Sequence, residues 1–216
     1  MDMHSHWVFD LDGTLLDVEA RYRRIHADLV TARGGRPDPG YWMHKREKTA
    51  ETAIAMACGL SEEHAEGYAQ DRLLVLEQDR YLAHDRLFPG ALEVLRAVGP
   101  GNALLATKRR DRAALDRQLE RLGLRDRFAR VMTPAAGADK STLHPAIRDW
   151  WRSAGRIVSV TDSPQDITDG KASGFVTIAV LSGLRSRRFI EAAEPDSIIA
   201  AIGELTLEKI EHVSAN

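Results

Sequence analysis

The stretch "WVFDLDGTLLD", residues 7–17, decides how the chain is interpreted. Its first apolar residues, 7–9, predict a buried strand that ends at Asp10. Residues two apart in an extended chain point to the same side, so we expect Asp10 and Asp12 to face one spot. Converging carboxylates repel each other and are costly to bury unless a cation or a shared proton compensates. The stretch therefore predicts a metal site, an acid–base pair, or both.

The residues behind the two acids favour a sharp turn. Gly13 permits a left-handed backbone, and we expect the Thr14 side chain to hydrogen-bond the turning backbone. Because Asp before Gly is also common in ordinary turns, a turn with a helix N-cap is an alternative explanation of the two acids.

The composition is that of an ordinary globular protein. The 216 residues suffice for one sizeable core plus a subdomain, with 44% hydrophobic and 29% charged residues. The net charge of −2 gives no indication of nucleic-acid binding. A single cysteine, Cys58, excludes an internal disulfide framework, and we expect it to pack within a helix. Without a leader pattern or an apolar run of about 20 residues, we expect a cytoplasmic protein with no membrane partner.

The order of elements predicts the architecture. A strand at 6–10 is followed by a helix-prone stretch over about 18–85, broken by "PDPG" at 37–40. Within it, Ser61 is the expected N-cap of a helix, and a helix is expected from Gln70 to Leu82. Further strands are expected at 102–107, 127–133, 156–163, 175–183 and 196–200, and helices at 87–99, 110–124, 142–155, 164–174 and 202–213.

Strands alternating with helices predict an α/β fold, a doubly wound parallel sheet with helices on both faces. The helical stretch does not fit this alternation, so we expect a catalytic core of residues 1–16 and 86–216 with a helical cap, residues 17–85, inserted after the first strand. Ligands of such sheets bind beyond the carboxyl ends of the strands. The polar residues that end the expected strands are Asp10, Asp12, Thr107, Lys108, Asp162, Ser163 and Asp166.

With these motifs the sequence resembles the haloacid dehalogenase (HAD) superfamily of hydrolases, and within it the phosphoglycolate phosphatase-like and β-phosphoglucomutase-like subgroup with an inserted helical cap. The resemblance covers nearly the whole chain, in four motifs that follow the family's order. They are "DLDGT" at 10–14, "LLAT" ending at Thr107, a lone lysine at Lys140 in "GADKS", and "TDSPQD" at 161–166.

The resemblance implies a magnesium-dependent phosphatase that hydrolyses a small-molecule phosphate monoester through an aspartyl phosphate. Asp10 is the implied nucleophile, and Asp12 the implied acid that protonates the leaving oxygen and then accepts a proton from water. The implied Mg²⁺ ligands are Asp10, Asp12 through its backbone carbonyl, Asp162 and Asp166. Thr107, a backbone N–H at Lys108, and Lys140 are the implied phosphate-binding groups.

The sequence departs from the family pattern in two places. Ser141 follows Lys140 where Lys-Pro is usual, so Lys108 is a rival for the phosphate-stabilising lysine. Thr161 stands before Asp162, where glycine or an acid is usual. Asp162 also has an alternative reading as the N-cap of the helix that begins at Pro164.

Other functions remain alternatives. A phosphomutase of the same superfamily uses the same aspartyl phosphate, and a non-catalytic regulatory protein of the same fold is the second alternative. A dehalogenase fits less well, since its chemistry needs neither Asp12 nor magnesium. In the cap, Lys45, Arg46 and Lys48 are candidate contacts for a second anionic group of the substrate, with a solvated helix face as the alternative. We expect a monomer or a homodimer, and a histidine tail, His4 and His6, exposed ahead of the first strand.

Overall fold

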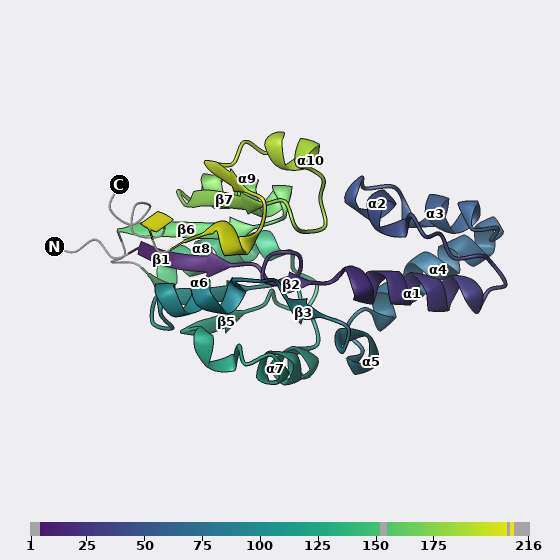
Figure 1. Ribbon diagram of the computed structural model, residues 1–216, viewed down its shortest axis with the longest axis horizontal. Helices are drawn as coiled ribbons and strands as arrows, with labels where there is room; N and C mark the ends of the chain where they lie inside the picture. Colours follow the sequence, from purple (N-terminus) through teal and green to yellow (C-terminus); the bar gives the residue numbers. More distant parts are fainter. Residues whose placement is uncertain (1–4, 152–154, 207, 210–216) are drawn as a thin grey trace. The chain divides into compact units, whose positions relative to one another are not determined.

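The computed structural model describes residues 5–151, 155–206 and 208–209 (Figure 1). The chain divides into two compact units, residues 1–17 with 86–216, and residues 18–85. Asp17, which the sequence analysis assigns to the cap, lies in the first unit. It belongs to β2 (Leu16–Asp17), which pairs antiparallel with β3 (Arg86–Leu87). The chain thus leaves and re-enters the first unit through one short two-stranded ribbon.

The first unit is built on a six-stranded sheet in the order β5-β4-β1-β6-β7-β8. All of its neighbouring strands pair in parallel, which confirms the predicted α/β fold. The strands are near-continuous apolar runs, as expected where both faces of a parallel sheet are covered. Their bounds are β1 (Ser5–Phe9), β4 (Ala103–Ala106), β5 (Arg130–Met132), β6 (Arg156–Thr161), β7 (Val176–Val180) and β8 (Ser197–Ile199).

Strand β1 lies between β4 and β6, so the residues that follow these three strands share one edge of the sheet. The register pairs Phe9 of β1 with Leu105 of β4 and with Val160 of β6. Asp10 continues this register, because its backbone N–H donates to the Val160 carbonyl at 3.0 Å. The ends of β1 and β6 are therefore level with each other.

The helices between these strands cover the sheet (Figure 1). Leu143 and Ile147, four residues apart on one side of α8, share a buried cluster with Val8, Leu104 and Ile157 of the strands. The α-helices are α6 (Ala91–Val98), α7 (Arg112–Arg121), α8 (Leu143–Trp150), α9 (Pro164–Ala172) and α10 (Arg187–Glu191), and the 3₁₀ segments are η1 (Arg125–Arg127), η2 (Lys140–Thr142) and η3 (Ile202–Glu204).

Two expectations about the ends of this unit are corrected. His6 is part of β1 and stacks on Trp151, with the ring centroids 4.5 Å apart, instead of lying in an exposed tail. The last predicted helix, 202–213, begins as the 3₁₀ turn η3, and much of the rest of that range, like His4, lies outside the described residues. The sequence analysis also missed α10, which is only five residues long.

The second unit, residues 18–85, is helical. Its helices are α1 (Glu19–Thr31), α2 (Tyr41–Arg46), α3 (Glu51–Ala57), α4 (Glu62–Val75) and α5 (Asp79–Leu82). Ser61 caps α4 as predicted, because its hydroxyl accepts the His64 backbone N–H at 3.3 Å. The helix predicted from Gln70 to Leu82 is wrong: α4 ends at Val75, and the chain restarts as α5 after Gln78 adopts an extended backbone.

The core of this second unit is small and contains the single cysteine. Cys58, as predicted, packs in a buried cluster with Val30, Ala55 and Tyr68 among others. An ion pair between Arg21 and Asp85, 3.3 Å apart and both with fully buried side chains, joins the first and last segments of the unit. No helix among the described residues is long and apolar enough to cross a membrane.

Candidate active site

The turn after β1 is shaped by its glycine. Gly13 has a φ of 85°, and its N–H donates to the Leu16 carbonyl at 2.8 Å. A Cβ atom at Gly13 or at Gly183 would collide with the Asp162 carboxylate. Two backbone segments therefore approach Asp162 at positions where only glycine fits. The expectation for Thr14 is wrong, because its hydroxyl is buried with no hydrogen-bond partner among the described residues.

Four predicted residues meet at this edge of the sheet, and we call them the Asp10 cluster: Asp10, Lys140, Asp162 and Asp166. The Lys140 ammonium donates to Asp10 Oδ1 and to Asp166 Oδ2, the latter at 2.5 Å. Thr161, the departure from the family pattern, donates its hydroxyl to the same Asp166 oxygen at 3.1 Å. Lys140 reaches the cluster from η2, far along the chain from both aspartates.

Asp162 is held by backbone from a different loop. Its Oδ2 accepts the Leu184 N–H at 2.5 Å. Asp162 is not the helix cap, because the Ser163 side chain accepts the Asp166 N–H at 3.4 Å and is the N-cap of α9. The Asp162 side chain is therefore left to the cluster, and the first turn of α9 supplies Asp166.

The cluster holds more negative than positive charge in a buried place. Burial raises the pKa of Asp10 to about 6, with Lys140 opposing the rise and the Asp166 charge adding to it. Burial, and then the Asp10 charge, raise the pKa of Asp162 to about 8. Burial alone would lower the pKa of Lys140, but the carboxylates of Asp10 and Asp166 raise it above its usual value. One lysine thus compensates three carboxylates only in part.

The residues of this cluster fit a divalent cation by their chemistry. Carboxylate oxygens are the ligands Mg²⁺ prefers, and the raised pKa values mark a place that positive charge would stabilise. Asp166 Oδ1 is buried without a hydrogen-bond partner among the described residues. Within residues 5–151, 155–206 and 208–209, however, no three His, Cys, Asp or Glu side chains already form a metal cage. In the arrangement described, Lys140 lies between two of the acids.

Asp12 has a different partner from Asp10. Its Oδ1 accepts a hydrogen bond of 2.7 Å from Arg109, although the Asp12 charge still contributes to the raised pKa of Asp10. Arg109 is a buried residue that the sequence analysis missed, and Gln118 of α7 binds its guanidinium at 3.1 Å.

The polar residues after β4 separate into two sides. Thr107 and Arg109 are buried, whereas Lys108 between them is exposed. Among the described residues, neither the Thr107 nor the Lys108 side chain forms a hydrogen bond or ion pair with the Asp10 cluster. Between the two rival lysines, Lys140 is the one that contacts Asp10. The sequence did contain a signal for Arg109. Side chains alternate in an extended chain, so Arg109, two positions after Thr107, is expected on the same side as Thr107.

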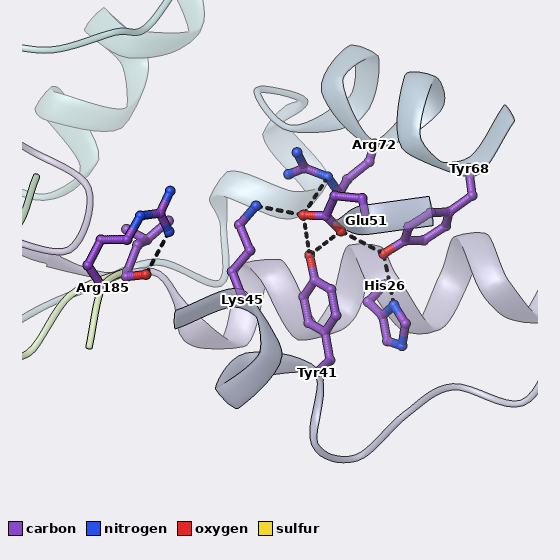
Figure 2. Close-up of polar contacts among 8 residues, drawn as sticks. His26, Tyr41, Lys45, Glu51, Tyr68, Arg72 and Arg185 are labelled. Carbon is purple, nitrogen blue, oxygen red and sulfur yellow. Dashed lines mark hydrogen bonds and ion pairs between the residues drawn. The ribbon is translucent and has the colours of Figure 1, made fainter. Parts of the chain in front are cut away.

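The three basic candidates of the second unit lie on and after α2. Lys45 donates to Glu51 Oε1 at 2.6 Å (Figure 2). Arg46 ends α2, and Lys48 is exposed in the following turn with a φ of 57°. Lys45 is therefore engaged inside its own unit.

Glu51 is the centre of a network that we call the Glu51 cluster: Tyr41, Lys45, Glu51, Tyr68 and Arg72 (Figure 2). Besides Lys45, the hydroxyls of Tyr41 and Tyr68 each donate to Glu51 Oε2 at 3.3 Å, and Arg72 forms an ion pair of 3.2 Å. Behind Tyr68, His26 Nε2 accepts the Asp38 N–H, so Nδ1 carries the proton and donates to the Tyr68 oxygen at 2.9 Å.

Comparison with known proteins identifies the family of the chain. Residues 7–180 match the family of haloacid dehalogenase-like hydrolases. A phosphoglycolate phosphatase of Synechococcus elongatus is 26% identical over 211 residues, which cover 92% of this chain and 93% of the relative. An N-acetylmuramic acid 6-phosphate phosphatase of Pseudomonas putida is 29% identical over 82% of each chain. A haloacid dehalogenase-like hydrolase of Streptococcus pneumoniae has a similar fold, with a TM-score of 0.74 at 17% identity, over 94% of this chain and 97% of its own.

Proposed function

The chain belongs to the haloacid dehalogenase-like hydrolase family and is a phosphatase of phosphate monoesters, and we propose that it works through an aspartyl phosphate on Asp10. The observation that carries this proposal is the contact between Lys140 and Asp10 in a buried cluster with surplus carboxylates. A carboxylate attacks phosphorus and forms a mixed anhydride that water later cleaves. Asp10 is the proposed nucleophile because it ends the central strand β1 and retains 11% exposure of its side chain.

The other residues of the site take the roles that their chemistry allows. Lys140 neutralises charge between Asp10 and the phosphoryl group, while Thr107 and the Lys108 backbone N–H bind phosphoryl oxygens. Asp12 protonates the leaving oxygen and afterwards takes a proton from the attacking water. Mg²⁺, which is general in this family, would be held by Asp10, the Asp12 carbonyl, Asp162 and Asp166, and would supply positive charge against the phosphoryl oxygens.

The proposed substrate is a small phosphate ester, either a sugar phosphate or a short acid such as phosphoglycolate. The two relatives named above act, by their names, on phosphoglycolate and on N-acetylmuramic acid 6-phosphate. Each of these molecules carries a carboxylate besides its phosphate. Residues 18–85 are proposed as the cap that selects the substrate, with Arg46 and Lys48 as the proposed contacts for that second anionic group; Lys45, the third candidate, is paired with Glu51.

The test is phosphate release from a panel of esters in Mg²⁺ or in EDTA. The panel is 2-phosphoglycolate, N-acetylmuramic acid 6-phosphate, glucose 6-phosphate and nitrophenyl phosphate. We expect release to need Mg²⁺ and to fall at least about 10⁴-fold in Asp10→Asn, because no other group supplies the nucleophile. Asp126→Asn, an exposed aspartate in η1, is the matched control and should keep the wild-type rate.

Two outcomes contradict the proposal. Release that survives Asp10→Asn within tenfold would remove Asp10 as the nucleophile. Consumption of a sugar phosphate without release of phosphate would instead identify transfer to a sugar hydroxyl, the reaction of a phosphomutase.

A further inference from the structure

Arg109 is a buried cation beside Asp12 that the phosphatase chemistry above does not use. It lies in the connection between β4 and α7, three residues beyond the end of the strand. Its Nη2 donates to Asp12 Oδ1 at 2.7 Å, and only 4% of its side chain is exposed, against 21% for Asp12. A buried guanidinium is costly unless its partners are well placed. Here the partner is the residue proposed to move the proton.

Arg109 is itself held in place. The same Nη2 atom donates to Gln118 Oε1 at 3.1 Å, and Gln118 is buried in α7. The helix is fixed just after Arg109, because the Asp111 side chain accepts the Ala114 N–H at 2.9 Å as its N-cap. Because the planar Arg109 guanidinium is hydrogen-bonded to an anchored helix, its N–H groups donate in a fixed direction.

The site therefore has two cations with separate partners. Lys140 contacts Asp10 and Asp166, whereas Arg109 contacts Asp12. A general acid must keep its carboxyl within hydrogen-bond reach of the leaving oxygen, and a partly exposed aspartate has several side-chain rotamers to choose from. Fixing one rotamer beforehand removes the entropic cost of ordering the Asp12 side chain in the transition state.

We propose that Arg109 is a positioning residue: it donates to Oδ1 of the Asp12 carboxyl group and so orients Oδ2, which carries the proton, toward the leaving oxygen, with Gln118 holding the guanidinium. The inference rests on the proposed function, in which Asp12 is the general acid. Arg109 acts through Asp12, so its loss slows the reaction most where the leaving oxygen needs the proton most. Esters of weakly acidic alcohols and phenols have that need, and nitrophenyl phosphate has little of it.

The experiment measures kcat and KM for a series of phenyl phosphates, from unsubstituted phenyl to nitrophenyl, so that shape stays nearly constant while the leaving group changes. The variants are Arg109→Met, Arg109→Lys and Gln118→Leu, with Asp12→Asn as the reference. Arg110→Gln, the exposed neighbouring arginine, is the matched control. Circular dichroism and thermal unfolding check that each variant is folded.

In Arg109→Met we expect kcat/KM to fall about 30-fold for phenyl phosphate and less than about 3-fold for nitrophenyl phosphate. KM should stay nearly unchanged. In Arg109→Lys and Gln118→Leu, kcat/KM should also fall more for phenyl phosphate than for nitrophenyl phosphate. The difference should be smaller than in Arg109→Met, because each variant keeps part of the arrangement. Arg110→Gln should match the wild type for every ester.

An equal loss for all esters, or a loss confined to KM, would overturn the inference, because it would assign Arg109 to binding or to folding. If Arg109→Met does not fold, the test passes to Arg109→Lys and Gln118→Leu. The inference is overturned if both variants show the same leaving-group dependence as the wild type. Failure of the proposed function looks different: Asp12→Asn itself would then show a leaving-group dependence no steeper than that of the wild type, or Asp10→Asn would stay active.

Discussion

The Asp10 cluster and the Glu51 cluster are both built from acids and cations, yet their charge balance is opposite. In the first unit, one lysine serves Asp10 and Asp166 while Asp162 adds a third carboxylate. In the second unit, the single carboxylate of Glu51 is surrounded by two cations and two tyrosine hydroxyls. The first arrangement leaves negative charge that a divalent cation would compensate. The second is complete by itself.

This difference in charge balance indicates whether a buried carboxylate has a structural or a functional role. A carboxylate whose partners satisfy it stabilises the fold around it, and removing it leaves charge uncompensated. Carboxylates that repel each other cost stability, and they are kept where chemistry requires them. We therefore expect substitutions in the Asp10 cluster to change activity, and substitutions in the Glu51 cluster to change stability.

After Asp10→Asn, the largest effect should come from Lys140→Met. We expect kcat for a phosphate ester to fall about 10²- to 10³-fold, because the charge between Asp10 and the phosphoryl group is no longer neutralised. Lys108→Met tests the rival lysine, and we expect a loss below about tenfold from its exposed side chain. The reverse ranking in steady-state kinetics would show that Lys108 is the phosphate-stabilising lysine.

Glu51→Gln should act on stability instead. Loss of this carboxylate leaves Lys45 and Arg72 close together without their counter-charge, so we expect the free energy of unfolding to fall by about 2 kcal/mol. Urea unfolding followed by circular dichroism measures this. Glu62→Gln, in the first turn of α4, is a control with an expected change below about 0.5 kcal/mol. Equal stability of Glu51→Gln and the wild type would contradict the structural role.

In EDTA, Asp162→Asn should raise the free energy of unfolding, whereas Glu51→Gln lowers it. The pKa of Asp162 in the folded chain, about 8, lies above the usual aspartate pKa of 3.8, so the folded chain binds more protons than the unfolded chain between these pH values. Stability is therefore lost as pH rises through this window. We expect the variant to be more stable than the wild type by about 1 kcal/mol near pH 8, and by less near pH 5. A destabilised variant at both pH values would show that the repulsion is absent.

An effect of similar size concerns His26. Burial lowers its pKa below the usual 6.5, against the opposing charges of Asp38 and Glu51. The unfolded chain therefore takes up a proton more readily as pH falls below about 6.5, and the stability that His26 contributes is lost there. We expect the stability difference between wild type and His26→Gln to shrink by about 1 kcal/mol from pH 8 to pH 5.5. The exposed His64→Gln should show no such change; a constant difference for His26→Gln would contradict a neutral, buried His26.

Several features of the fold could be predicted because they are local. Apolar runs ending in polar residues predicted the central strands, and the alternation with helices predicted a parallel sheet. The serine N-cap at Ser61 followed from side-chain chemistry within four residues. The break between α4 and α5 was missed, because the helical pattern continues through Gln78 while the backbone there is extended.

The sequence by itself determined which acids end neighbouring strands, since that depends only on the order of apolar and polar residues along the chain. The tertiary structure alone decided which partners these acids meet. Arg109 on Asp12, the Leu184 N–H on Asp162 and the Glu51 cluster join segments far apart in the chain. Such contacts arise from packing of whole helices and loops, and a local pattern indicates at most the side on which a residue lies, not the partner it meets.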